Sequence, residues 1–207
     1  VNKLLVGKVD DNFNWLPLWV HLQDTAGVMK LLLENWIADA TVESCGMQFE
    51  NFYAIAEFVA ATHDIGKATS YFQAIICKKV PILYDNIVSS GLIVCENMLH
   101  RGKTPHSYAG QWILQSDTVS INLPESVANV IGAHHGAPCP RKTLNGVDDL
   151  LVVYPSNFYG EEDDSSIQSM QWQSIWNEIV NEALMLSGFD SISEVPDLTV
   201  DAQVLLS

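Results

Sequence analysis

The sequence predicts an all-α domain, and three observations support this class. Apolar residues recur at intervals of three and four along several stretches, as they do on the buried face of a helix. The chain has 207 residues, of which 48% are hydrophobic and 17% charged, a composition typical of one domain with a well-buried core. Several histidines fall at ends of the predicted helices, and helix ends that converge can build a metal site at the centre of a bundle.

The predicted helices follow from this apolar spacing and from helix-breaking residues. The apolar segment from Phe52 to Ala60 runs into a His-Asp pair, and Gly66 behind it permits a sharp exit from the helix. Gly188 is expected to end a helix rich in tryptophan. We expect 39–50 to be a loop or a helix end and 143–159 to be irregular. The predicted helices cover 21–36, 52–60, 71–79, 87–99, 107–114, 124–133, 172–184 and 199–206.

The net charge of the chain is −15, and it restricts the function classes. Binding to phosphates requires clustered Lys and Arg, so this balance argues against a free-standing nucleic-acid binder. A nuclease stays possible, because bound divalent cations would offset the charge locally and a basic partner could deliver the strand.

The cellular setting can also be predicted from the sequence. No apolar run approaches the roughly 18 residues of a membrane span, and no signal peptide is visible, so we expect a cytoplasmic protein without membrane contact. The four cysteines are far apart and form no CxxC pair, which indicates free thiols in a reducing compartment. They are Cys45, Cys77, Cys95 and Cys139.

The histidines, with one aspartate, form the candidate metal site. His100 lies in a predicted loop and is left out. The carboxylate of Asp64 has two oxygens and can bridge two metals, and Lys67 brings a cation close to the same place. Five histidines and one aspartate exceed the four ligands of a tetrahedral zinc, whereas they suit two six-coordinate ions that share Asp64. The candidate ligands are His21, His63, Asp64, His106, His134 and His135.

This ligand set indicates the metal and the chemistry. Mixed imidazole and carboxylate ligands suit divalent Mn, Co, Ni, Fe or Zn, and disfavour Mg. Two such ions lower the pKa of a bound water and hold phosphate oxygens during in-line attack on phosphorus. The sequence therefore predicts one or two divalent transition-metal ions and a phosphoester substrate.

The order His…His-Asp…His…His-His resembles the HD superfamily of metal-dependent phosphohydrolases. The sequence motifs around these residues resemble, more specifically, those of the HD nuclease domain of Cas3, the effector of type I CRISPR systems. These motifs occupy residues 15–26, 63–69 with 72–73, 105–107 and 132–138. The resemblance implies an HD-domain helical bundle with a central metal site. It also implies an endonuclease and exonuclease that degrades single-stranded DNA in CRISPR interference, an antiviral defence.

The resemblance also assigns roles and partners. His21, His63 and Asp64 would hold one metal. Asp64 and the three later histidines, His106, His134 and His135, would hold the other. Lys67 matches the family's motif lysine, which would stabilise phosphate charge beside Asp64. The implied partners are single-stranded DNA, a helicase domain that is fused or separate, and a Cascade complex.

One feature departs from the family pattern. The family carries a further ligand Asp in a C-terminal helix, shortly after a segment like 203–207, whereas Asp201 precedes that segment. We therefore expect 1–207 to be a single HD nuclease domain, cut off before the last metal-ligand helix of a longer protein.

Two alternatives stay open at this point. One is an HD-type phosphohydrolase of nucleotides or cyclic dinucleotides. The motif His-His-Gly-Ala-Pro and the Trp-rich segment before His21 argue against it. The other is a catalytically silent HD interaction module. The negative charge and the missing Asp favour the silent module, whereas Lys67 and the complete set of five histidines argue against it.

Overall fold

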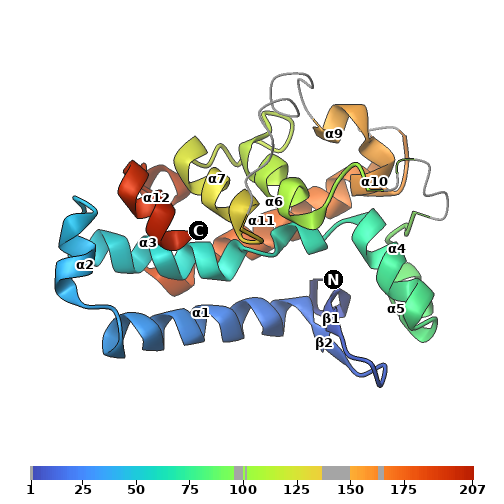
Figure 1. Cartoon of the computed structure of the whole chain (residues 1–207). Helices are drawn as coiled ribbons and strands as arrows, with labels where there is room; N and C mark the ends of the chain where they lie inside the picture. Colours follow the sequence, from blue (N-terminus) through green and yellow to red (C-terminus); the bar gives the residue numbers. More distant parts are fainter. Residues whose placement is uncertain (1, 96–99, 101, 137–149, 163–165) are drawn as a thin grey trace.

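The computed structural model describes residues 2–95, 100, 102–136, 150–162 and 166–207, and helices make up most of them (Figure 1). The prediction of an all-α helical bundle is confirmed, with one small addition: β1 and β2 form a two-stranded antiparallel sheet. In chain order the elements are η1 Asn2–Leu4, β1 Val6–Val9, β2 Trp15–Pro17, α1 Leu18–Asn35, α2 Asp39–Ser44, α3 Phe49–Thr62, η2 Ile65–Lys67, α4 Ser70–Lys79, α5 Ile82–Ser89, α6 His106–Gln115, α7 Glu125–Ala133, α9 Leu150–Val153, α10 Pro155–Tyr159, α11 Ile167–Ser187, η3 Ile192–Glu194 and α12 Val200–Leu206.

Helix α3 is the centre of the fold. Its side chains are buried over most of its length, including Phe52, Ile55 and Phe58, because other helices cover several of its sides. Helices α1, α11 and α7 all pack against it, and Figure 1 shows α1 lying alongside α3. The end of α3 therefore lies inside the bundle, where the His-Asp pair follows directly.

The turn after α3 packs closely against α6, and Gly66 makes this possible. A Cβ atom on Gly66 would collide with the carbonyl oxygen of His106 and lie 2.5 Å from the amide nitrogen of Gly110. Gly66 lies in the short helix η2 and is not among the glycines with positive φ. This glycine is therefore required for close backbone approach to α6, a reason that the expected sharp exit from the helix did not include.

The helix predicted over 87–99 is wrong for residues 90–95. Helix α5 begins at Ile82 and ends at Ser89, and Gly91 then adopts a φ of 93°. The side chain of Gln168 on α11 bonds the backbone that follows. It donates to the Gly91 carbonyl at 2.8 Å and accepts from the Ile93 amide at 2.7 Å. These groups are thus satisfied without helix, and 92–95 are not helical. Residues 96–99 lie outside the described residues.

Helices also lie within 39–50, which was expected to be a loop or a helix end, and within 143–159, which was expected to be irregular. Helix α2 lies within 39–50, and α9 and α10 lie within 150–159, whereas 143–149 fall outside the described residues. Helix α10 ends at Gly160, which is left-handed with a φ of 85°. The expected stop at Gly188 is confirmed, since this glycine has a φ of 80° at the C-cap of α11.

The remaining expectations concern membranes and thiols. Among the helices that the structure describes, none is both long and apolar enough to cross a bilayer. Cys45 and Cys77 are buried free thiols, as predicted, Cys95 is also buried, and Cys139 lies outside the described residues. Burial raises the pKa of the Cys77 thiol to about 11, so this sulfur stays protonated at neutral pH.

Candidate metal centre

Two of the predicted ligands occupy the same position at the end of a helix. His63 is the C-cap of α3 and His134 is the C-cap of α7. The carbonyls of a last helical turn have no partner within the helix, and each histidine supplies one. Nδ1 of His63 lies 2.8 Å from the Ala60 carbonyl oxygen, and Nδ1 of His134 lies 2.6 Å from that of Ile131.

These two bonds fix which ring nitrogen of His63 and of His134 carries a proton. A carbonyl oxygen only accepts hydrogen bonds, so Nδ1 of His63 and of His134 carries the proton and donates it. A neutral ring then presents the lone pair of Nε2 to whatever lies opposite. A backbone or carboxylate partner on the far nitrogen is the usual support of a metal-binding histidine.

The Asp64 carboxylate is the common centre of the site. It is 3% exposed, and its two oxygens face different neighbours. Oδ2 lies 2.7 Å from Nε2 of His21, 3.0 Å from Nε2 of His63 and 2.7 Å from Nζ of Lys67. Oδ1 faces the other side of the site, at 3.3 Å from Nε2 of His106 and 3.4 Å from Nε2 of His134.

The ligand atoms fall into two groups, each spanning no more than 4.8 Å. The first group consists of His21, His63 and Asp64, and the second group consists of His106, His134 and His135. In the second group, Nε2 of His135 lies 2.8 Å from Nε2 of His106. The rings of His63 and His134 are 5.5 Å apart and join the groups. The two groups and the carboxylate thus form one continuous site.

The contacts within the site fit a bound cation. Oδ1 of Asp64 and Nε2 of His134 are buried and have no hydrogen-bond partner among the residues that the structure describes. The lone pair of His63 Nε2 faces a carboxylate oxygen, and two imidazole Nε2 atoms face one another in the second group. Two facing acceptors, as at His63 and Asp64, need a cation between them or an added proton, whereas the contact between His106 and His135 is satisfied either by a cation or by a hydrogen bond from one neutral ring to the other. A divalent metal would supply such a cation, and the donor set of nitrogen and carboxylate oxygen suits a transition metal.

The charge states agree with this donor set. Burial would raise the pKa of the Asp64 carboxyl, but the polar ring nitrogens of His106, His134, His21 and His63 around it outweigh burial and hold the pKa well below its usual range. Asp64 is therefore an anion in the folded protein. Burial, followed by the neighbouring His134 and His106, lowers the pKa of His135. His135 is thus kept neutral, which is the form that binds metal.

All residues predicted from the sequence as ligands, together with Lys67, meet at this site. His100 lies elsewhere, with its ring 4.9 Å from that of Tyr154. Asp201 is on α12 and belongs to neither group. Sequence reasoning missed Phe72 as a neighbour of the site. Its ring lies 5.5 Å from the His106 ring and 5.7 Å from Nζ of Lys67.

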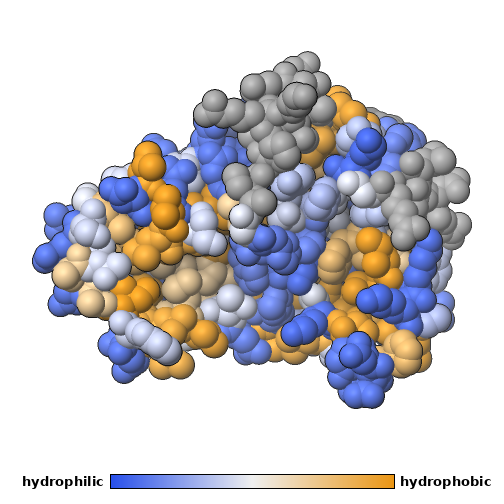
Figure 2. Space-filling view, in the orientation of Figure 1, coloured by the Kyte–Doolittle hydropathy of each residue, from blue (hydrophilic) through white to orange (hydrophobic). Residues whose placement is uncertain are grey.

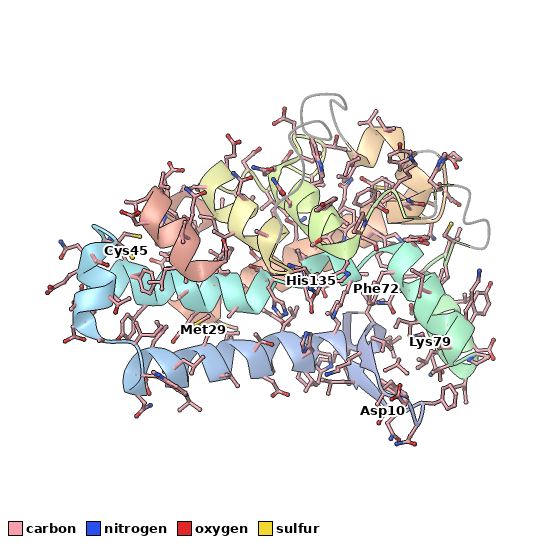
Figure 3. All side chains as sticks on the ribbon, viewed as in Figure 1. Asp10, Met29, Cys45, Phe72, Lys79 and His135 are labelled. Carbon is pink, nitrogen blue, oxygen red and sulfur yellow. The ribbon has the colours of Figure 1, made fainter. Side chains whose placement is uncertain are left out.

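The site opens on one face of the molecule. His135 is exposed, while the other histidines of both groups are partly buried. Figure 3 shows His135 and Phe72 near the middle of the molecule, where α3, α6 and α4 approach one another. In the same view, Figure 2 shows hydrophilic side chains gathered over the middle of this face, with hydrophobic surface on either side. A polar substrate can therefore reach the second group from solvent.

The fold and the site define an HD-type domain of the metal-dependent hydrolases. The sequence model of the family described as "Cas3, HD domain" matches residues 7–207. The chain therefore belongs to the Cas3 HD domain family, as the resemblance predicted.

Two relatives place this result in context. The "CRISPR-associated nuclease/helicase Cas3" of Streptococcus thermophilus is 33% identical over 219 residues, which cover 93% of this chain and 22% of that protein. A solved structure described as "Crystal structure of CRISPR-associated protein" matches with a TM-score of 0.59 at 17% identity, over 100% of this chain and 26% of that one. This second likeness supports the fold. The chain spans about a quarter of the length of each relative.

Proposed function

We propose that this domain is a metal-dependent nuclease that hydrolyses phosphodiester bonds of single-stranded DNA in CRISPR interference. The proposal rests on one observation above all: each oxygen of the buried Asp64 carboxylate faces a different set of histidines. A carboxylate in this position suits two metals on either side of a scissile phosphate. We further propose 1–207 as one HD nuclease domain, with all six predicted ligands as metal ligands.

The protein's own residues would hold and orient the reacting groups. His21, His63 and Asp64 would hold one metal, and the second group with Asp64 would hold the other. The metals would lower the pKa of a bound water and neutralise phosphate oxygens. Lys67 would place its ammonium beside the same phosphate and stabilise the charge that develops during attack.

Lys67 is well prepared for this role. Its Nζ lies 2.7 Å from Oδ2 of Asp64 and 5.7 Å from the centroid of the Phe72 ring. The carboxylate and the face of the ring both favour a cation at this point. The ammonium is thereby held at the edge of the first group, without needing to reorganise when a phosphate binds.

The partners follow from charge and family. A net charge of −15 repels a polyanion beyond the immediate metal site. We therefore propose that a helicase, fused or separate, supplies the single strand, and that a Cascade complex recruits both. The relative from Streptococcus thermophilus is described as a nuclease/helicase, which supports this arrangement. A cytoplasmic location accompanies the proposal.

The test is cleavage of circular single-stranded DNA, which offers no ends and so detects endonuclease activity. Mn²⁺, Co²⁺, Ni²⁺ and Mg²⁺ are compared on the wild-type protein and on Asp64→Ala. We expect nicking with a transition metal, weaker nicking with Mg²⁺, and a loss of at least about 100-fold in Asp64→Ala. The size follows because removing even a partner of a metal ligand costs about 10–100-fold.

Three outcomes would contradict the proposal. Cleavage that persists in Asp64→Ala or in excess chelator would mean that another centre does the chemistry. Hydrolysis of nucleotides or cyclic dinucleotides without DNA cleavage would favour the nucleotide phosphohydrolase. Metal binding without hydrolysis of either substrate, with or without an added helicase partner, would favour the silent interaction module.

A further inference from the structure

Gln73 on α4 is a fully buried amide that joins two segments of the metal centre. Its side chain is 0% exposed. Oε1 accepts a hydrogen bond from the Val6 amide at 3.1 Å, and Nε2 donates to the Val6 carbonyl at 3.0 Å. Nε2 also donates to the Lys67 carbonyl at 2.8 Å. One side chain thus pairs with both backbone groups of a residue in β1 and with the end of η2.

Strand β1, with Leu5 before it, also contacts the first turn of α1. The Leu18 amide, at the start of α1, donates to the Leu5 carbonyl at 2.8 Å. Gly7 has no side chain because α1 lies too close: a Cβ there would sit 3.1 Å from Cα of Leu18 and 3.2 Å from Cβ of His21. The position of β1 therefore sets the position of His21.

We propose that Gln73 is a positioning residue for the first group. Through its bonds to β1 and to η2, it sets the positions of His21 and of Lys67 relative to Asp64. The side chains of His21 and Lys67 both contact Oδ2 of Asp64, each at 2.7 Å. Removing the amide would free β1 to move with the first turn of α1, so these two short distances would be lost together. This inference rests on the proposed metal-dependent function.

The second group should be insensitive to this change. Its histidines lie at the start of α6 and at the end of α7, which pack against each other. His134 is fixed by the carbonyl of Ile131 in its own helix, and among the described residues the Gln73 side chain bonds to Val6 and Lys67 and to neither α6 nor α7. We therefore expect the loss of the Gln73 amide to weaken metal binding in the first group and to leave metal binding in the second group unchanged.

The experiment compares Gln73→Met with Gln168→Met. Methionine keeps the length of the side chain and removes its hydrogen bonds. Gln168 is the matched control because it too accepts from one backbone amide and donates to a nearby carbonyl, but it joins α11 to residues 91–93. Any general cost of deleting a buried amide should appear in both variants.

Affinity for Mn²⁺ is measured by calorimetry in two backgrounds. His135→Ala removes a candidate ligand of the second group, and His21→Ala removes one of the first group. We expect Gln73→Met to weaken Mn²⁺ binding by about 10-fold in the His135→Ala background, the lower end of what a residue behind a metal ligand contributes. In the His21→Ala background we expect less than about a twofold change. Gln168→Met should change neither affinity by more than this.

Hydrogen exchange of the metal-free protein provides a second, independent measurement. Gln73→Met should accelerate amide exchange in the first turn of α1 as well as in β1 and 64–68, whereas Gln168→Met should not. Gly7→Ala provides a variant that keeps every hydrogen bond of Gln73. Its added methyl should displace His21 and weaken Mn²⁺ binding only in the His135→Ala background.

The outcomes separate this inference from the proposed function. Equal losses in both backgrounds, or no loss in either, would overturn the role of Gln73. If the wild-type protein bound no metal, the proposed function would fail, and exchange would decide the positioning role alone. Acceleration confined to β1, with the first turn of α1 unchanged, would then overturn it.

Discussion

The two groups of the candidate metal centre are held by different kinds of contact. The first group joins α1 to the end of α3, and His21 is 43 residues from Asp64. It depends on β1, on Gln73 and on the turn η2. The second group joins the start of α6 to the end of α7, two helices that pack directly against each other. One group is therefore assembled through several segments, the other through a single helix pair.

This difference has consequences for how the site tolerates change. Substitutions outside the first group can displace it through β1 or η2, although they touch no ligand. The second group should respond mainly to changes at the α6–α7 contact. The exposure of the ligands differs in the same direction, because Asp64 is buried whereas His135 is exposed. The following predictions test this contrast.

The largest effect is expected where the two groups meet, at Gly66. A methyl in Gly66→Ala would strike the backbone of α6 at His106 and Gly110, and backbone atoms cannot move aside as a flexible side chain can. We expect a loss of more than about 3 kcal/mol in the free energy of unfolding, measured by urea denaturation, because overpacking of this severity exceeds the usual range.

Gly27→Ala is the matched control for this substitution. Gly27 lies inside α1, and nothing lies within 4 Å of a Cβ atom placed there. Alanine should stabilise the helix by about 0.5–1 kcal/mol relative to glycine. If Gly66→Ala were as harmless as Gly27→Ala, the close packing of η2 on α6 would be refuted, and with it the rigid link between the groups.

A smaller effect is expected at the support behind the first group. Nε1 of Trp176 on α11 donates to the Ala68 carbonyl at 2.6 Å, directly after η2, whereas Nε1 of the equally buried Trp172 has no hydrogen-bond partner among the described residues. Both Trp→Phe substitutions reduce side-chain volume alike. We expect Trp176→Phe to cost about 1–3 kcal/mol more than Trp172→Phe, because only Trp176→Phe leaves a buried carbonyl unpaired.

The same denaturation experiments decide this prediction. Equal costs would mean that the indole bond contributes nothing, and that burial alone explains both tryptophans. A greater cost for Trp172→Phe would reverse the interpretation. Mn²⁺ affinity in the His135→Ala background should follow stability, with Trp176→Phe weaker than Trp172→Phe.

The sequence predicted which residues meet at the candidate metal centre far better than it predicted what holds them in place. His63 and His134 were recognisable because each follows an apolar helical stretch, and helix ends converge in a bundle. The long-range pairing of Gln73 with Val6 was not predictable, because neither spacing nor composition indicates which buried backbone needs a partner. The two histidine-to-carbonyl bonds could have been found, since a histidine three residues after a last-turn carbonyl can bond to it.

The errors have equally physical causes. Gly66 was expected to permit a sharp exit from the helix, which is a local reason for a glycine, whereas its close contact with α6 is a property of the fold and leaves no local signal. The prediction of a helix over 87–99 did not take into account that the side chain of Gln168 bonds the backbone of Gly91 and Ile93. An apolar stretch predicts burial, but a partner distant in sequence decides whether its backbone bonds within a helix.

The smallest effect on stability is expected for His135→Ala, compared with His63→Ala. The His135 ring is exposed, so in metal-free buffer its removal should change the free energy of unfolding by no more than about 0.5 kcal/mol. His63→Ala should cost about 1–3 kcal/mol, because it leaves the Ala60 carbonyl without its donor and removes a neighbour of buried Asp64. Thermal unfolding with and without Mn²⁺ measures both.

Metal should change this ranking. A ligand that binds only the folded state raises its stability according to concentration and affinity, so Mn²⁺ should raise the unfolding temperature of the wild-type protein more than that of either variant. The near-neutral His135→Ala would then fall behind the wild type only when metal is present. A cost of His135→Ala that was the same in chelator and in Mn²⁺ would instead assign this histidine to packing, and would leave the second group without a metal.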